Sequence, residues 1–166
     1  MNKLTEGDIQ SLVRRYLLQN GFQLFTRTAK GESLHYRTNL VTPPRYKIPD
    51  HIAIKNNTVL IFEDKIKYAD LFKKGNSDIE KLSCFISNKT NLQDFNQLIT
   101  KIGVKLTKPS IVPACASLKP ENNKKIIPAN FVFLGITPTD DKYVIEFCQG
   151  TNCSSLFNFD KSALTL

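Results

Sequence analysis

The strongest structural pattern in the chain is the stretch Ile48–Lys65, which reads IPDHIAIKNNTVLIFEDK. Two runs rich in Ile, Val, Leu and Phe flank Asn56 and Asn57, and Asn tolerates the positive φ that a tight two-residue turn requires. The pattern therefore predicts a β-hairpin with these two residues at its turn. Continued outward from the turn, the same register places Asp50 opposite Glu63.

Two acids and a lysine share one face of this hairpin, because side chains alternate between faces along a strand. Asp50, Glu63 and Lys65 lie beside an apolar stripe made of Ile52, Ile54, Val59 and Ile61. Carboxylates directly opposite each other destabilise a sheet, and apolar neighbours increase that cost by removing water. We therefore expect a cation here: Lys65 supplies one charge, and Mg²⁺, which binds carboxylates, phosphate and water, would supply more. His51 points to the opposite face, where a structural role is expected.

The spacing of these residues resembles a known motif. Pro49-Asp50, an apolar hairpin and then Glu63-Asp64-Lys65 are similar to the PD-(D/E)XK motif of the restriction-endonuclease-like nuclease superfamily. The resemblance implies that Asp50, Glu63 and the backbone carbonyl of Asp64 bind Mg²⁺, with Mn²⁺ as a substitute. It also implies that Lys65 orients or activates the attacking water and stabilises the charge that develops on the phosphate.

A plainer interpretation of the same residues is a surface hairpin. In that case Lys65 forms an ordinary ion pair with Glu63 or Asp50, worth roughly 0–1 kcal/mol. The apolar stripe beside the charges favours the nuclease site, because a solvated face would not need it.

The N-terminal segment predicts an amphipathic helix that begins after Thr5 and ends near Gly21. Its apolar residues recur at helical spacing: Ile9, Leu12, Val13, Tyr16 and Leu17. Glu6 in the first turn is explained by the helix dipole. Many members of the resembling family carry a further metal-binding acid on their first helix, so Glu6 is also a candidate ligand. Gln10, one turn on, is a weaker one.

Several cations around the motif are candidates for binding nucleic acid. The segment 30–47 predicts a long loop that would carry His35, Tyr36, Arg37, Arg45 and Tyr46 toward the edge where Asp50 lies. Lys67, Lys73 and Lys74 follow the second motif strand closely, and with Arg45 they are the predicted phosphate contacts. Plain solvation of these side chains is the alternative.

The remainder of the chain predicts two helices and then short strands. Ser77 is the expected N-cap of one helix, and Thr90 or Asn91 that of the next, which ends at Gly103. Strands are expected at 110–112, 131–136 and 143–148, with a hairpin turn at 138–141. Residues 149–166 show no clear period.

Length and composition agree with a single domain over residues 1–166 of the α/β or α+β class, with a mixed central sheet flanked by helices. The formal net charge of +8 indicates a polyanionic partner such as nucleic acid. Four cysteines without a CxxC pair and only two histidines offer little for a zinc site or a Ser-His-Asp triad. No apolar run is long enough to span a membrane, so a soluble, cytoplasmic protein is expected.

The function that these patterns favour is that of a Mg²⁺-dependent deoxyribonuclease, and more specifically an endonuclease. Restriction, repair and mobile-element processing are all compatible, and RNA is the alternative substrate. The small size favours a homodimer or action with a partner protein. The alternative function is an inactive module of the same fold that binds nucleic acid or protein. A hydrolase using Cys or Ser lacks a convincing base.

Overall fold

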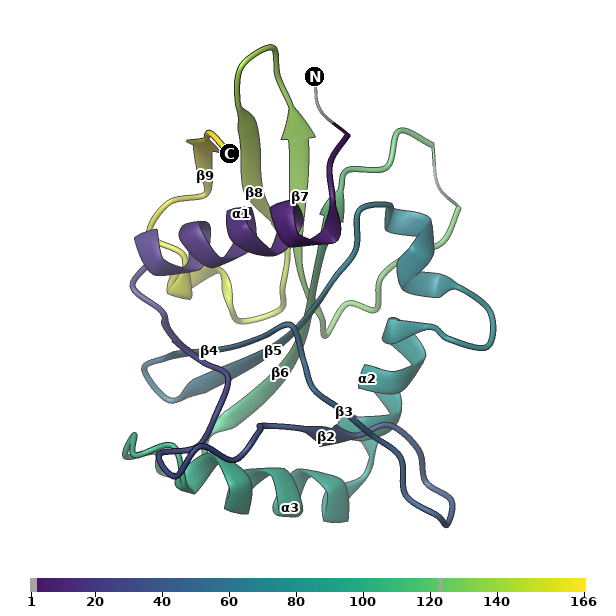
Figure 1. Ribbon diagram of the computed structural model, residues 1–166, viewed down its shortest axis with the longest axis vertical. Helices are drawn as coiled ribbons and strands as arrows, with labels where there is room; N and C mark the ends of the chain where they lie inside the picture. Colours follow the sequence, from purple (N-terminus) through teal and green to yellow (C-terminus); the bar gives the residue numbers. More distant parts are fainter. Residues whose placement is uncertain (1–2, 123) are drawn as a thin grey trace.

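The computed structural model describes residues 3–122 and 124–166, and the predicted hairpin forms two neighbouring strands of its main sheet (Figure 1). Strand β4 (His51–Lys55) pairs antiparallel with β5 (Thr58–Asp64) in the register predicted for their apolar residues. Asn56 takes a φ of 54° at the turn. Almost every residue of both strands is buried, so this is not the surface hairpin of the plainer interpretation.

Seven strands form one mixed sheet in the order β1-β4-β5-β6-β7-β8-β9. β5, β6 and β7 run parallel to one another, and the other neighbours are antiparallel. The further strands of this sheet are β1 (Gln23–Phe25), β6 (Ser110–Leu118), β7 (Val132–Pro138), β8 (Tyr143–Gln149) and β9 (Lys161–Leu164). β5 therefore has a partner strand on each side, which agrees with its apolar sequence.

Helices cover both faces of the sheet (Figure 1). Helix α1 (Glu6–Gln19) buries its predicted apolar stripe in one core, together with Ala53, Leu60 and Phe62 of the hairpin. Helices α2 (Asp78–Ser87) and α3 (Lys89–Thr100) close a second core around the stripe Ile52, Ile54, Val59 and Ile61. The predicted class is confirmed at the level of a mixed α+β arrangement.

The helix ends follow local capping chemistry. Thr5 caps α1 in a capping box with Asp8, and Gly21 follows the helix with a φ of 79°. Ser77 caps α2 as predicted, with its hydroxyl 3.2 Å from the Glu80 amide. The predicted start of α3 is wrong: the helix begins at Lys89, because the side chain of Asn88 accepts the amide of Asn91 at 2.9 Å.

Two segments without a clear pattern are more ordered than expected. The loop predicted at 30–47 contains β2 (Tyr36–Arg37) and β3 (Tyr46–Lys47), which form a separate two-stranded sheet next to α2 and α3. The C-terminal segment contains a short 3-10 helix, η2 (Ser154–Leu156), and β9, which pairs with β8. A second 3-10 helix, η1 (Tyr68–Phe72), follows β5. No helix in the described part of the chain is long and apolar enough to cross a membrane.

Candidate active site

The predicted site residues meet where β5 ends, near the N-terminal end of α1. Glu63 lies on the face covered by α2 and α3, and Asp64 lies on the face covered by α1. Asp50 directly precedes β4. Alternation along the strand thus sends the two neighbouring acids into different surroundings. The side chains of Glu63 and Asp64 are both fully buried.

Asp50 binds the end of β5 through its side chain. The paired ladder ends at His51 and Phe62, so Asp50 lies one residue beyond it instead of forming the expected strand pair with Glu63. Its Oδ2 accepts the backbone amide of Asp64 at 2.7 Å, and its Oδ1 accepts Nε2 of Gln10 at 2.7 Å. The carboxylate therefore satisfies an amide that the ladder does not reach, which explains the departure from ideal pairing.

Glu63 is held by two side chains from the β2–β3 sheet. The Tyr36 hydroxyl donates to Oε1 at 2.8 Å, and Nζ of Lys47 contacts Oε2. Burial raises the pKa of Glu63 to about 8, because the loss of water, together with the Asp50 and Asp78 carboxylates, outweighs the opposing effect of Lys47. The ionised form of this carboxyl thus depends on nearby positive charge.

Lys65 pairs with neither Glu63 nor Asp50. Its Nζ lies 3.1 Å from Oε1 of Glu6 and 3.6 Å from Oδ2 of Asp78. Burial alone would lower the pKa of Lys65, but the hydrogen bond to Glu6 and the charge of Asp78 raise it above its ordinary value. Glu6 is thus brought to the site from α1, where it contacts the motif lysine.

Asp78 and Lys47 belong to the site but were not predicted from the sequence. Asp78 is the first residue of α2, and its side chain is 2 % exposed. Its Oδ1 lies 2.7 Å from Nζ of Lys47 and 3.8 Å from Nζ of Lys81. The available signal was an acid directly after the N-cap Ser77, and it indicated only a helix start.

His51 lies on the opposite face, as predicted, and contacts the side chain of Asp64. Its Nε2 is 2.9 Å from Oδ2 of Asp64, an ion-pair distance, although within the described residues neither atom has an aligned hydrogen-bond partner. Burial raises the pKa of Asp64, with His51 acting in the opposite direction. The motif resemblance assigns a role only to the main-chain carbonyl of Asp64, so the contact between its side chain and His51 is a separate feature.

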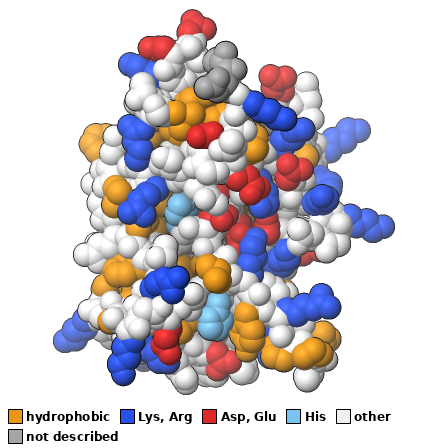
Figure 2. Space-filling view, viewed as in Figure 1, with side chains coloured by type: hydrophobic (Ala, Val, Ile, Leu, Met, Phe, Trp, Pro, Cys, Tyr) orange, Lys and Arg blue, Asp and Glu red, His pale blue; other side chains and the backbone are white. Residues whose placement is uncertain are grey.

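The predicted phosphate contacts are all exposed: Arg45, Lys67, Lys73 and Lys74. Lys67 and Lys73 flank η1, whereas Arg45 lies on the β2–β3 loop and lines a surface hollow with Gly75 and Asn76. Figure 2 shows acidic side chains gathered near the middle of one face, with Lys and Arg side chains around them. The surroundings of the site are therefore suited to a polyanion.

The fit of these side chains to a metal ion depends on their charges and their arrangement. The described residues hold no group of three His, Cys, Asp or Glu side chains arranged to bind a metal. Two of the acids, Glu63 and Asp78, already share the cation of Lys47. In the cluster of Glu6, Asp50, Glu63 and Asp78 with Lys47, Lys65 and Lys81, carboxylates outnumber ammonium groups by one. These oxygen ligands suit Mg²⁺.

Searches with this chain against protein-family models, curated proteins and solved structures found no match.

Proposed function

We propose that the chain is a metal-dependent nuclease with a restriction-endonuclease-like fold, and that it hydrolyses phosphodiester bonds in DNA. The observation that carries this proposal is the convergence of Asp50, Glu63 and Lys65 at the end of a buried strand. The ion pair expected by the plainer interpretation, between Lys65 and Glu63 or Asp50, does not form, because Lys65 pairs with Glu6 and Asp78 instead.

Asp50, Glu63 and the backbone carbonyl of Asp64 would hold Mg²⁺ or Mn²⁺. When bound, the metal would polarise the phosphate and lower the pKa of its water ligand. The protein's own part begins with Gln10 and the Asp64 amide, which fix the orientation of the Asp50 carboxylate through two hydrogen bonds of 2.7 Å. Such positioning keeps the ligand arranged before substrate arrives.

Lys65 would stabilise charge on the scissile phosphate. The hydrogen bond to Glu6 and the charge of Asp78 favour its protonated form, so it would act as a cation beside the phosphate. Glu6 and Asp78 hold the ammonium group from two different helices. The exposed cations Lys67, Lys73, Lys74 and Arg45 would contact the flanking phosphates.

A second function is favoured by one specific contact. Lys47 already neutralises Glu63, and an internal counterion of that kind can replace a metal in an inactive module. In that case the chain would bind nucleic acid through its basic faces without cutting it.

Cleavage of supercoiled plasmid, linear duplex and single-stranded DNA, with Mg²⁺, Mn²⁺ or EDTA, tests the proposal. We expect cutting that requires the metal and falls roughly 100-fold or more in Asp50→Asn and Lys65→Met. Asp140→Asn and Lys105→Met are matched controls at exposed positions and should cut normally. Salt-sensitive binding without cutting in any metal would favour the inactive module.

A further inference from the structure

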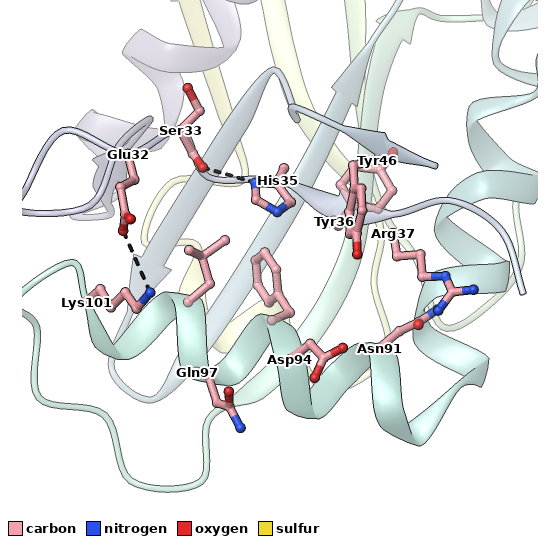
Figure 3. Close-up of a pocket in the computed structure, with 12 residues that line it drawn as sticks. Glu32, Ser33, His35, Tyr36, Arg37, Tyr46, Asn91, Asp94, Gln97 and Lys101 are labelled. Carbon is pink, nitrogen blue, oxygen red and sulfur yellow. Dashed lines mark hydrogen bonds and ion pairs between the residues drawn. The ribbon is translucent and has the colours of Figure 1, made fainter. Parts of the chain in front are cut away.

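A pocket of about 400 Å³ lies between the β2–β3 sheet and helix α3 (Figure 3). Sites for small molecules occupy roughly 300–1,000 Å³, so this pocket is large enough for one ring system. It adjoins the candidate active site through Tyr36, which lines the pocket and donates its hydroxyl to Glu63 at 2.8 Å. A group bound here would therefore be separated from Glu63 by the side chain of Tyr36.

The walls of the pocket suit a planar ring. His35 and Tyr46 form an edge-to-face pair with ring centroids 5.0 Å apart. Tyr46 is 57 % exposed, so part of its ring is accessible to a bound group. Phe95 and Leu98 of α3 add an apolar surface from the opposite side. Aromatic side chains are the usual stacking partners of unpaired bases.

One buried polar group in the pocket lacks a partner. Asn91 is 3 % exposed, and among the described residues its Nδ2 has no hydrogen-bond acceptor. Buried donors in native proteins are nearly always paired, so this amide needs an acceptor from outside the described residues, either a water molecule or a ligand in the pocket. Asp94 and Gln97, on the same helix, offer further hydrogen-bonding groups.

The charges in the pocket disfavour an anion. Lys101 is paired with Glu32 at 3.7 Å, and Arg37 is engaged by Asn39 and by the carbonyl of Val41. Asp94 adds a negative charge to the lining. Arg37 and Lys101 are matched in number by Glu32 and Asp94, so the lining has no net positive charge to attract a phosphate. A neutral heterocycle with acceptor atoms, in contrast, fits both the rings and the amide.

We propose that this pocket binds a nucleobase that has left the base stack, next to the phosphodiester bond that is cut. The inference rests on the proposed nuclease function and narrows its substrate to nucleic acid with an unpaired or extruded nucleotide. Tyr46 stacks on the base, and Asn91 donates to its edge.

The test measures base binding without cleavage. A short single-stranded oligonucleotide carrying 2-aminopurine is titrated with protein in EDTA. We expect saturable fluorescence quenching, weakened roughly 5- to 150-fold in Tyr46→Ala and little changed in Tyr46→Phe, which keeps the ring. The side-chain amide signal of Asn91 in a ¹H–¹⁵N spectrum should shift on saturation with the same oligonucleotide.

Unchanged quenching in Tyr46→Ala, or an unmoved Asn91 amide signal at saturation, would overturn the inference. Metal-dependent cleavage is assayed separately, on duplexes with and without one unpaired nucleotide. If the protein cuts no substrate but binds the base, and Tyr46→Ala abolishes this binding, the result would support the base-binding pocket and reject the nuclease function. If wild type and Tyr46→Ala cut each duplex equally well, the result would support the nuclease function and exclude base binding in the pocket.

Discussion

Glu63 is the residue on which the site's electrostatics depend. A buried carboxylate needs compensating charge, which Lys47 provides here, and the Tyr36 hydroxyl of the same small sheet adds a hydrogen bond. Removing one partner of such a group leaves the other buried and unpaired, which destabilises more than the net worth of the pair. The role of Lys47 can therefore be measured through stability, independently of any activity.

Lys47→Met removes the ammonium group and keeps much of the apolar stem. We expect the free energy of unfolding to fall by about 1–3 kcal/mol in EDTA, measured by urea denaturation. Mg²⁺ should restore part of this stability, because it would supply positive charge to the same carboxylates. The control Lys105→Met, at an exposed position, should change stability by no more than about 0.5 kcal/mol. Equal destabilisation in both variants would contradict the role given to Lys47.

Tyr16 should give the protein a pH dependence in alkaline solution. Burial raises the pKa of this phenol to about 12 from its ordinary 10.0, and its hydroxyl donates to the carbonyl of Phe159 at 2.7 Å. The stability that the neutral form contributes is complete below pH 10 and declines as the pH rises toward 12. The urea midpoints of wild type and Tyr16→Phe should therefore converge over that range. A constant difference between the two midpoints over that range would contradict the role given to Tyr16.

At the scale of elements, the N-terminus of α2 connects stability to the site. Ser77 is buried, accepts the amide of Glu80 and donates to the carbonyl of Leu71 at 3.0 Å. Asp78 follows directly and contacts Lys47 and Lys65. A change in how this helix begins should thus move a carboxylate that both lysines use.

Ser77→Ala should lower the free energy of unfolding by about 1 kcal/mol, because the variant lacks the cap hydroxyl. In a cleaving enzyme it should also reduce the turnover rate more than it changes substrate affinity, since the displaced group is Asp78 and not a side chain that binds nucleic acid. Ser87→Ala, at the exposed end of the same helix, is the matched control. Lower stability with an unaltered turnover rate would contradict the proposed link between the Ser77 cap and the candidate active site.

At the scale of the whole molecule, the net charge of +8 predicts binding that weakens with salt. The triple variant Lys67→Ala, Lys73→Ala, Lys74→Ala should reduce the slope of log affinity against log salt by about 0.9 for each phosphate that is no longer neutralised. Fluorescence anisotropy on duplex DNA in EDTA measures this slope. The control is a second triple variant in which the exposed lysines Lys89, Lys105 and Lys142 are changed to Ala, so that both variants have the same total charge. Identical slopes for the two triple variants would rule out a local binding face.

The local part of the fold was predictable because it depends on neighbours in the chain. Alternation of apolar residues predicted the β4–β5 register, and a polar residue before an apolar period predicted the caps Thr5 and Ser77. The start of α3 was misplaced because three neighbouring polar residues, Asn88, Thr90 and Asn91, compete as caps within one helical turn. The strand β9 was missed because an edge strand needs little apolar alternation.

The amino-acid sequence alone determined the hairpin, its acidic end and the opposite facing of Glu63 and Asp64, since strand period and turn chemistry act over a few residues. Only the tertiary structure decided the partners of those acids. In the sequence, Lys47 is 16 residues from Glu63 and 31 residues from Asp78, and Lys65 is 59 residues from Glu6. Such contacts depend on how the sheet and the helices pack, because a buried carboxylate is stabilised by a cation that the fold brings close to it. The local sequence pattern around each acid does not show which distant residue this will be.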